Sequence, residues 1–489
     1  MTAQRNLAML ADAIRHHQAG RLNEAERLYR QILQVDFQYT AEVHNNLGNL
    51  HKAQGRLGEA VESYERALAD KPDYADAHNN LGIAFKAQGR LDEAVESYRQ
   101  ALSHRPDYAE AHSYLGIALQ AQDKPEEAVE SYRRALAHKP DDADTHSNLG
   151  IALHTQGRLD EAVASFRRAL AHKPDFADAH QNLAIALLLT GRFEEGWKAH
   201  EWRWKAKQLA FTRRDFSQQQ WQGEAGANRV LLIHAEQGFG DSLQFCRYAP
   251  LAAARGFRVI LEVPPALARL MTSLPGVESI VPQGEPLPDF DLHCPMLSLP
   301  LAFNTHLDNI PAAIPYLFAG KQAVEDWRQR LGDSKSSLRV GLVWAGSSRA
   351  YSADLVLIDR RRSISPALLS PLFDIPNVKF YSLQKIGAKA PEAFGLLDYM
   401  DECHDFADTA ALVANLDLII SVDTAVAHLA AALGKPVWLL NRFDTCWRWL
   451  QHREDSPWYP SLRLFRQSAP GDWGGVIREV AEALRSEAK

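Results

Sequence analysis

A period of 34 residues runs through the N-terminal part of the chain and constrains its fold more than any other feature. The triplet Asn-Leu-Gly begins at Asn46, Asn80 and Asn148, and variants of it begin at Tyr114 and Asn182. An alanine, an aromatic residue and a proline follow the first four of these five triplets in turn: Ala60, Tyr64 and Pro72; Ala94, Tyr98 and Pro106; Ala128, Tyr132 and Pro140; Ala162, Phe166 and Pro174. Small residues let two antiparallel helices approach, aromatics fill the space between neighbouring repeats, and proline ends the second helix. The period therefore predicts a solenoid of stacked helix pairs.

The repeat extends in both directions beyond its regular part. A divergent first copy contains Gly20, Ala25 and Tyr29, and a partial last copy runs through Gly191 and Trp197. The pattern resembles the tetratricopeptide (TPR) repeat. This resemblance implies an α-solenoid, a TPR superhelix, which we place at residues 5–205.

Two ladders of polar side chains follow the repeat. One ladder is Asn46, Asn80, Asn148 and Asn182, interrupted by Tyr114, and the other is His44, His78, His112, His146 and His180. Stacked repeats turn such positions into lines along the superhelix, and an asparagine amide both donates and accepts hydrogen bonds. The asparagine ladder resembles that of the eukaryotic-type O-GlcNAc transferases, which implies a grip on an extended protein acceptor. The alternative is that the asparagines satisfy neighbouring loops and helix ends. For the histidines we expect a structural role.

Composition limits the class of protein. Hydrophobic residues make up 46% and charged residues 24% of the chain, and the net charge is −7, so no basic excess indicates a nucleic-acid partner or an anionic membrane surface. The four cysteines have no metal-ligand spacing and are expected to be reduced thiols. No secretory signal is recognisable at the start, and the most apolar stretch, 416–440, contains charged residues. We expect a cytoplasmic protein without a membrane span.

The second half of the chain alternates between buried strands and helices. After a polar linker at 206–228, the apolar run 230–233 indicates a parallel strand, residues 242–254 a helix and residues 258–263 another strand. A second unit of the same kind begins at Arg339. The alternation predicts parallel sheets with right-handed crossovers, in two Rossmann-like lobes at 229–335 and 336–489. Residues 473–486 are predicted to form a final helix that crosses back to the first lobe.

Ligands of such sheets bind at the carboxyl ends of the strands, where three loops are expected: 238–241, 345–348 and 423–424. Asp423 and Thr424 lie at a helix N-terminus, where free amides and the helix dipole favour a phosphate. His428 lies one turn further along the helix, on the same side as Thr424. The alternative is that Asp423 and Thr424 cap this helix and His428 packs beneath them.

The segment 421–436 resembles the donor-binding motif of the family 9, heptosyltransferase-type, GT-B glycosyltransferases. That resemblance implies that Asp423 and Thr424 bind the phosphates of a nucleotide-sugar donor and that His428 belongs to the same site. Ala425 stands where the family usually has glycine.

The loop Gly238-Phe239-Gly240-Asp241 resembles the "GD" turn of the same family. The resemblance implies an acceptor loop, in which Gly238 and Gly240 allow close approach and Asp241 is the catalytic base that takes the proton of the acceptor hydroxyl. The alternative is an aspartate that only caps the next helix. Glu236 is the second candidate for the base.

Further donor-binding residues are expected in the second lobe. Arg362 belongs to an arginine-serine element that follows the loop containing Ser347, and Lys385 follows the next strand. Such cations would neutralise a leaving diphosphate without a metal. A solvated basic loop is the alternative for the arginines.

The combination of both halves resembles the bacterial TPR-linked glycosyltransferases, including those that act on flagellin. It implies an inverting, metal-independent enzyme that moves sugar from a nucleotide-sugar donor, a substrate rather than a cofactor, onto a protein acceptor. One alternative is a protein-binding scaffold with a degenerate GT-B domain. Another is a heptosyltransferase-like enzyme of lipopolysaccharide assembly.

Overall fold

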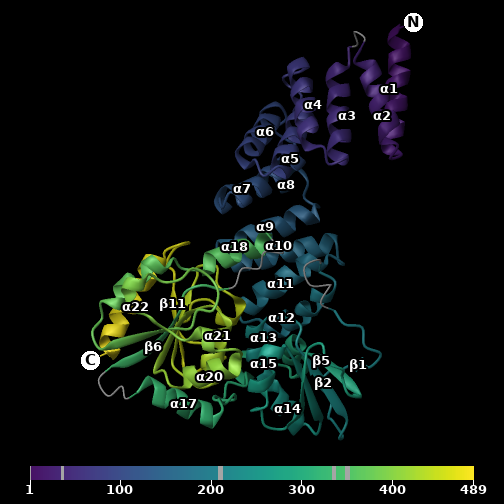
Figure 1. Cartoon of the computed structure of the whole chain (residues 1–489). Coiled ribbons are helices and arrows are strands. Elements are labelled where there is room, and N and C mark those ends of the chain that lie inside the picture. The colour runs from purple at the N-terminus through teal and green to yellow at the C-terminus, as the bar shows by residue number, and fades with distance from the viewer. Residues whose placement is uncertain (1, 35–37, 207–212, 333–336, 347–352, 489) are drawn as a thin grey trace. The chain divides into compact units, whose positions relative to one another are not determined.

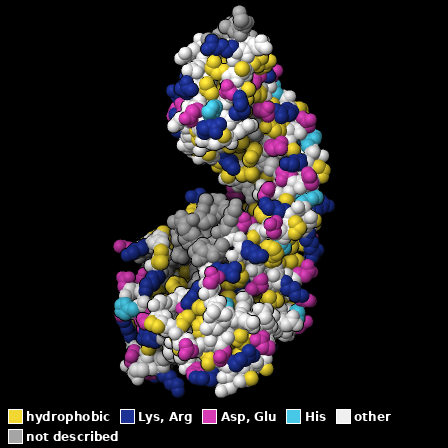
Figure 2. All heavy atoms as spheres, turned by 90° about the vertical axis from the view of Figure 1, so that its right-hand side faces the viewer, with side chains coloured by type: hydrophobic (Ala, Val, Ile, Leu, Met, Phe, Trp, Pro, Cys, Tyr) yellow, Lys and Arg dark blue, Asp and Glu magenta, His cyan; other side chains and the backbone are white. Residues whose placement is uncertain are grey.

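A computed structural model describes the chain except residues 1, 35–37, 207–212, 333–336, 347–352 and 489. The chain divides into two compact units, Met1–Ala179 and His180–Lys489. Each unit is described by itself. On the face seen in Figure 2, Lys and Arg side chains alternate with Asp and Glu side chains.

The first unit is a row of antiparallel helix pairs, as the period predicts (Figure 1). Its helices are α1 (Thr2–Gln18), α2 (Leu22–Ile32), α3 (Thr40–Ala53), α4 (Leu57–Asp70), α5 (Ala75–Ala87), α6 (Leu91–His104), α7 (Ala109–Ala121), α8 (Pro125–His138), α9 (Ala143–Thr155) and α10 (Leu159–His172). The division between the units falls inside the next helix, α11 (Ala177–Leu189).

In four of the repeats, a glycine on the first helix packs against an aromatic ring on the second. A Cβ on Gly48 would lie 2.5 Å from the ring of Tyr64, and one on Gly150 would lie 2.5 Å from the ring of Phe166. The aromatic side chain therefore packs onto the glycine of its own repeat. Tyr98 also stacks on Tyr114 of the next repeat, with 6.0 Å between the ring centroids. The glycine is required because any larger side chain would push the two helices apart.

The second unit begins with the end of α11 and with α12 (Phe193–His200), the last helix of the repeat pattern. The indole N–H of Trp197, on α12, donates to the carbonyl of Thr305 at 3.1 Å. Trp197 also packs edge-on against Trp447 and Trp458. The last repeat helix is thus built into the α/β half.

In the described part of the second unit, two fully parallel sheets confirm the predicted α/β character. The first has the strand order β1-β5-β2-β3-β4 and the second β11-β10-β9-β6-β7-β8. The strands are β1 (Gln219–Gln220), β2 (Val230–His234), β3 (Arg258–Val263), β4 (Val277–Pro282), β5 (Leu292–Pro295), β6 (Leu338–Val343), β7 (Val378–Ser382), β8 (Leu397–Asp398), β9 (Leu418–Val422), β10 (Val437–Asn441) and β11 (Leu462–Arg466).

Helices accompany both sheets (Figure 1). They are α13 (Phe239–Phe245), α14 (Ala249–Ala254), α15 (Pro265–Met271), α16 (Leu299–Ala302), α17 (Lys321–Leu331), α18 (Ala353–Arg362), α19 (Ser370–Phe373), α20 (Phe406–Ala414), α21 (Ala425–Ala432) and α22 (Trp473–Glu487). In the ranges that the structure describes, no helix is both long and apolar enough to cross a membrane.

Two segments differ from what the sequence led us to expect. Part of the segment 206–228, expected to be a linker, joins the first sheet: β1 pairs with β5, and the side chain of Trp221 is buried. The final helix α22 was expected to cross back to the first lobe. Its apolar face, which includes Val476 and Val480, packs instead into the hydrophobic core of the six-stranded sheet. The helix thereby buries the apolar face of that sheet, which would otherwise be exposed to water.

Candidate functional site

The residues predicted to form the site lie where two helices contact each other, one that follows a strand of the first sheet and one that follows a strand of the second. Helix α13 follows β2 and contacts α21, which follows β9. A Cβ on Gly240 would lie 3.0 Å from Cδ2 of His428 and 3.8 Å from Cα of Ala425. Gly240 and His428, which the sequence only suggests as parts of one site, are therefore in contact. Glycine at 240 is what lets the two helices approach so closely.

His428 is a buried side chain with fixed surroundings. Its Nδ1 lies 2.9 Å from the hydroxyl of Tyr459, and its ring stacks on Trp449 with 5.2 Å between the centroids. Burial lowers the pKa of His428 to about 3, although the carboxylate of Asp423 opposes this shift. The imidazole is thus neutral near pH 7. Its Nε2 lies 3.9 Å from Oδ1 of Asp423, so the first helical turn brings these two predicted residues together.

Asp241 is held from two sides. Its Oδ2 accepts the backbone N–H of Gly238 at 3.1 Å, which is the helix-capping role that the alternative predicted. Its Oδ1 accepts a hydrogen bond from the guanidinium of Arg448, which comes from the segment after β10. Arg448 also donates from Nε to the side-chain oxygen of Gln244 at 2.7 Å. Burial alone would lower the pKa of Arg448, but the charge of Asp241 raises it overall.

Glu236, the second candidate for the base, is committed elsewhere. Arg203 donates to its two carboxylate oxygens at 3.1 and 3.0 Å, and the backbone N–H of Leu297 donates at 3.0 Å. Burial raises the pKa of Glu236, while Arg203 opposes that shift. Because this carboxylate joins the segment after α12 to the first sheet, its role is structural.

Thr424 occupies the N-cap position of α21, but its side chain makes no capping hydrogen bond in the described structure. Its hydroxyl lies 3.0 Å from the hydroxyl of Ser421 instead. The side-chain cap that the alternative reading gives to this threonine is therefore not seen in the described structure. The extended backbone at 424 (ψ 169°) turns the hydroxyl toward the end of β9.

Arg362 lies beside the same loop. Its Nη1 donates to the backbone carbonyl of Asp423 at 3.2 Å, and its Nη2 lies 2.8 Å from Oδ1 of Asp359. A Cβ on Gly346 would lie 2.5 Å from the guanidinium, so the glycine after β6 leaves the space that Arg362 occupies. Arg362 of the arginine-serine element is thus in contact with the loop at Asp423.

Two other predicted donor residues are not placed in this group. Lys385 is exposed, and its ammonium group donates to the carbonyl of Cys403. Ser347 lies outside the described residues. Next to Lys385 in the chain, Gln384 orders the loop after β6, because its side-chain oxygen accepts the N–H groups of Trp344 and Ala345 at 3.0 and 2.9 Å.

The sequence-based prediction missed Arg448, which stands within a run of aromatic residues. Four aromatic residues of that run are buried, namely Trp447, Trp449, Trp458 and Tyr459. The signal for Arg448 was a cation just beyond the carboxyl end of a buried strand, β10.

The asparagine ladder is partly exposed on the first helices of the repeats. Asn46, Asn80 and Asn148 lie in the first unit, and Asn182 belongs to the second. The amide of Asn80 donates to the side-chain oxygen of Asn45 at 3.0 Å, which links two repeats. Asn80 therefore contacts the first helix of the preceding repeat, and not a loop or a helix end.

Three histidines of the ladder join neighbouring repeats. The Nε2 atoms of His78, His112 and His146 lie 2.9, 2.9 and 2.8 Å from the carbonyls of Pro72, Pro106 and Pro140. Each histidine therefore ties the start of one repeat to the proline that closes the preceding repeat.

Comparisons with known families match both halves of the chain. Residues 48–89 and 84–123 match the TPR repeat family, and residues 115–175 and 147–197 match the tetratricopeptide repeat family. Residues 404–440 match glycosyltransferase family 9 (heptosyltransferase), and this range contains Asp423, Thr424 and His428.

Protein FlbA of Caulobacter vibrioides is 28% identical over 320 residues, which cover 60% of this chain and 52% of FlbA. The chain thus spans about half the length of this curated relative. Among solved structures, MamA is 23% identical with a TM-score of 0.32, over 34% of this chain and 98% of that one. TTC0263 of Thermus thermophilus is 25% identical with a TM-score of 0.30, over 37% of this chain and 99% of that one.

The repeat half is therefore a TPR domain, and the second half has the parallel-sheet α/β character in which the family 9 segment lies. Together these findings support a glycosyltransferase-like protein with a TPR domain.

Proposed function

We propose that the protein is a GT-B glycosyltransferase that moves a sugar, with inversion, from a nucleotide-sugar donor onto a protein acceptor. The observation that carries the proposal is the meeting of α13 and α21. The loop that resembles the acceptor turn of family 9 contacts the helix that follows the donor motif, through Gly240 and His428. In this proposal residues 229–335 form the acceptor lobe and residues 336–489 the donor lobe, with the TPR domain at 5–205.

The donor diphosphate would bind at the start of α21. Backbone N–H groups at a helix N-terminus and the helix dipole favour a phosphate, and the side chain of Thr424 leaves the first turn uncapped. Arg362, on the carbonyl of Asp423, would supply positive charge to the leaving diphosphate without a metal. Lys385 and Ser347 complete the proposed donor residues.

The acceptor hydroxyl would lie at the loop of Gly238 and Gly240. Its oxygen attacks the anomeric carbon on the face opposite the diphosphate, the bond to the diphosphate breaks, and the hydroxyl proton passes to Asp241. An ionised carboxylate has about four acceptor positions, of which Arg448 and Gly238 occupy two. Arg448 would hold Asp241 in one orientation, and the remaining positions would be available to the hydroxyl.

The TPR domain would hold the acceptor protein along the asparagine ladder. In this proposal, flagellin is one possible acceptor protein. A cytoplasmic location belongs to the proposal. The cysteines at 246, 294, 403 and 446 are free thiols, as is usual in a reducing compartment.

One observation favours a second candidate, a TPR scaffold whose GT-B domain is degenerate. The ion pair between Asp241 and Arg448 occupies the proposed base, and Ala425 replaces the usual glycine of the donor motif.

A thermal-shift panel of nucleotides and nucleotide sugars separates the two candidates. Selective stabilisation by one nucleotide sugar, followed by detection of transferred sugar on a protein by mass spectrometry, would support the enzyme. If no nucleotide or nucleotide sugar raises the melting temperature at millimolar concentration, the scaffold replaces it.

A further inference from the structure

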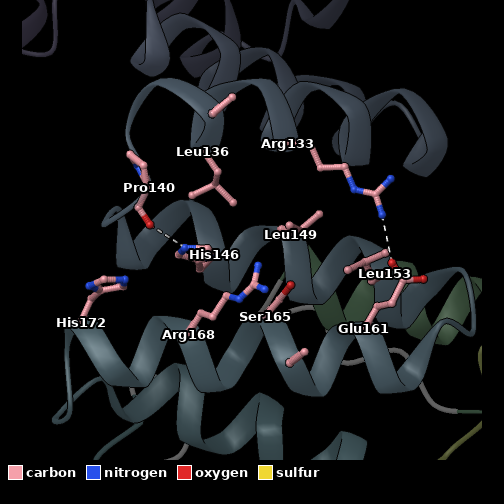
Figure 3. Close-up of a pocket in the computed structure, with 12 residues that line it drawn as sticks. Arg133, Leu136, Pro140, His146, Leu149, Leu153, Glu161, Ser165, Arg168 and His172 are labelled. Carbon is pink, nitrogen blue, oxygen red and sulfur yellow. Dashed lines mark hydrogen bonds and ion pairs between the residues drawn. The ribbon is translucent and has the colours of Figure 1, made fainter.

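A cavity of about 640 Å³ opens in the first unit between α8, α9 and α10 (Figure 3). Its apolar wall includes Leu136 of α8 and Leu149 and Leu153 of α9, and Arg168 and His172 line it from α10. Cavities of this size hold peptide side chains or small ligands. The cavity lies away from the asparagine ladder. His146, Leu149 and Leu153 face it at helical spacing, whereas Asn148 lies on another face of α9.

The cavity follows from one change in the repeat. Three repeats have glutamate at the position of Ala164, namely Glu62, Glu96 and Glu130. In the preceding repeat, Oε1 of Glu130 lies 3.0 Å from Nε of Arg134, and in the repeat before that Gln100 donates to Glu96 at 2.8 Å. Alanine at 164 removes both the volume and the charge of this carboxylate.

Arg168 occupies the position of Arg134 but lacks that partner. Within the described part of the chain, no carboxylate forms an ion pair with Arg168. Arg133, at the other end of the cavity, is already paired with Glu161, with 3.0 Å between Nη2 and Oε2. The lining therefore offers one guanidinium that lacks the glutamate with which Arg134 pairs one repeat earlier.

His146 adds a second polar group. Its Nε2 must donate to the carbonyl of Pro140, 2.8 Å away, because a carbonyl can only accept. Burial lowers the pKa of His146, although that hydrogen bond opposes the shift, so the ring is neutral near pH 7. Its Nδ1 is then an acceptor, and this buried atom has no partner among the described residues.

We propose that this cavity binds an acidic peptide segment of a protein partner, with a carboxylate on Arg168 and a neighbouring aliphatic side chain between the leucines. The carboxylate of the peptide would replace the one that Glu130 supplies one repeat earlier. An aliphatic side chain of the peptide suits Leu136, Leu149 and Leu153. This proposal does not depend on the transferase activity.

The test uses the full chain and fluorescence polarisation with three pools of short, labelled, degenerate peptides. The pools contain a fixed Leu-Glu pair, a Leu-Gln pair or an Ala-Glu pair. We expect the Leu-Glu pool to bind about tenfold more tightly than either other pool, as a charge-assisted hydrogen bond and a buried aliphatic side chain imply. Equal binding of the Leu-Gln pool would overturn the proposal.

Three variants locate the site. Ala164→Glu restores the glutamate of the other repeats and should remove the preference for the Leu-Glu pool, and Arg168→Gln, which mimics Gln100, should do the same. Arg134→Gln removes the same charge one repeat earlier and should change nothing. The proposal fails if all three variants behave alike, or if the first two bind like the wild type.

Two further measurements test whether the variant is folded and what occupies the cavity. Thermal unfolding checks that Ala164→Glu is folded, which we expect because glutamate is native to this position in three repeats. Sedimentation checks the occupant: a dimer that Arg168→Gln dissociates would show that a second copy fills the cavity and would overturn the peptide proposal.

Discussion

The guanidinium of Arg448 donates to the carboxylate of Asp241 across 207 residues of sequence, and it joins the loop after β2 to the segment after β10. The two side chains are 12% and 17% exposed, so water screens the pair only in part. The ion pair thus fixes the proposed base in one orientation.

Asp241→Asn should lower turnover by roughly 10²–10⁴-fold, the usual contribution of a general base, and leave donor affinity unchanged. Loss of the charge also leaves Arg448 without its partner, so the melting temperature should fall. The double variant Asp241→Asn/Arg448→Gln is the control: it should regain stability without regaining turnover. Steady-state kinetics at saturating donor, with calorimetry of donor binding, make the measurement. Normal turnover in the single variant would reduce Asp241 to a helix cap.

The sheets and their loops could be predicted because their signals are local. The segments 230–233 and 258–263 were predicted as strands, and they lie in β2 and β3. Arg448 could not be predicted as the partner of Asp241, because no period or spacing relates residues so far apart. The partner of the Thr424 hydroxyl could not be predicted either. This hydroxyl could have capped the helix that follows it, but in the structure it pairs with the hydroxyl of Ser421.

Gly240→Ala should destabilise the protein by about 1–3 kcal/mol, the usual cost of overpacking. The added Cβ would lie 3.0 Å from His428, which Tyr459 and Trp449 hold in place. Gly238→Ala is the matched control in the same loop: its Cβ would meet nothing closer than Asp241 Oδ2 at 3.5 Å. Denaturant unfolding of both variants is the measurement, and equal stability would show that α13 and α21 can separate freely.

Asp423→Ala should weaken donor binding, because the side chain at the start of α21 is removed while its backbone carbonyl still accepts from Arg362. Arg362→Gln should weaken it as well, through the loss of positive charge. Calorimetry with the cognate nucleotide sugar measures both. Unchanged affinity in a folded Asp423→Ala protein would exclude this carboxylate from the donor site.

His428 should make stability depend on pH. Its pKa is about 3 in the folded protein and near 6.5 when unfolded, so between these values the unfolded chain binds a proton that the folded chain does not. This residue's contribution to stability is therefore complete above pH 6.5 and decreases as the pH falls toward 3. His428→Gln should flatten that slope relative to the wild type in urea unfolding series from about pH 7 to about pH 5. Parallel slopes for the two proteins would show that His428 is protonated at no cost in the folded state.

The asparagine ladder is best tested at Asn148 and Asn182, where, as at Asn46, the described residues show no side-chain hydrogen bond between repeats. Replacing Asn148 and Asn182 together by alanine should weaken the apparent affinity for the protein acceptor and leave donor affinity intact, because the contacts with an extended chain are spread over several repeats. Asn80→Ala is unsuitable alone, since it also removes the hydrogen bond to Asn45. Deleting the repeats is less informative still: Trp197 packs against Trp447, and Arg203 pairs with Glu236, so removing them would expose apolar surface and a buried carboxylate. The measurement is the apparent KM for the acceptor, and thermal unfolding is the control for folding. An unchanged KM in the double variant would make the ladder structural and leave the acceptor to be held elsewhere on the chain.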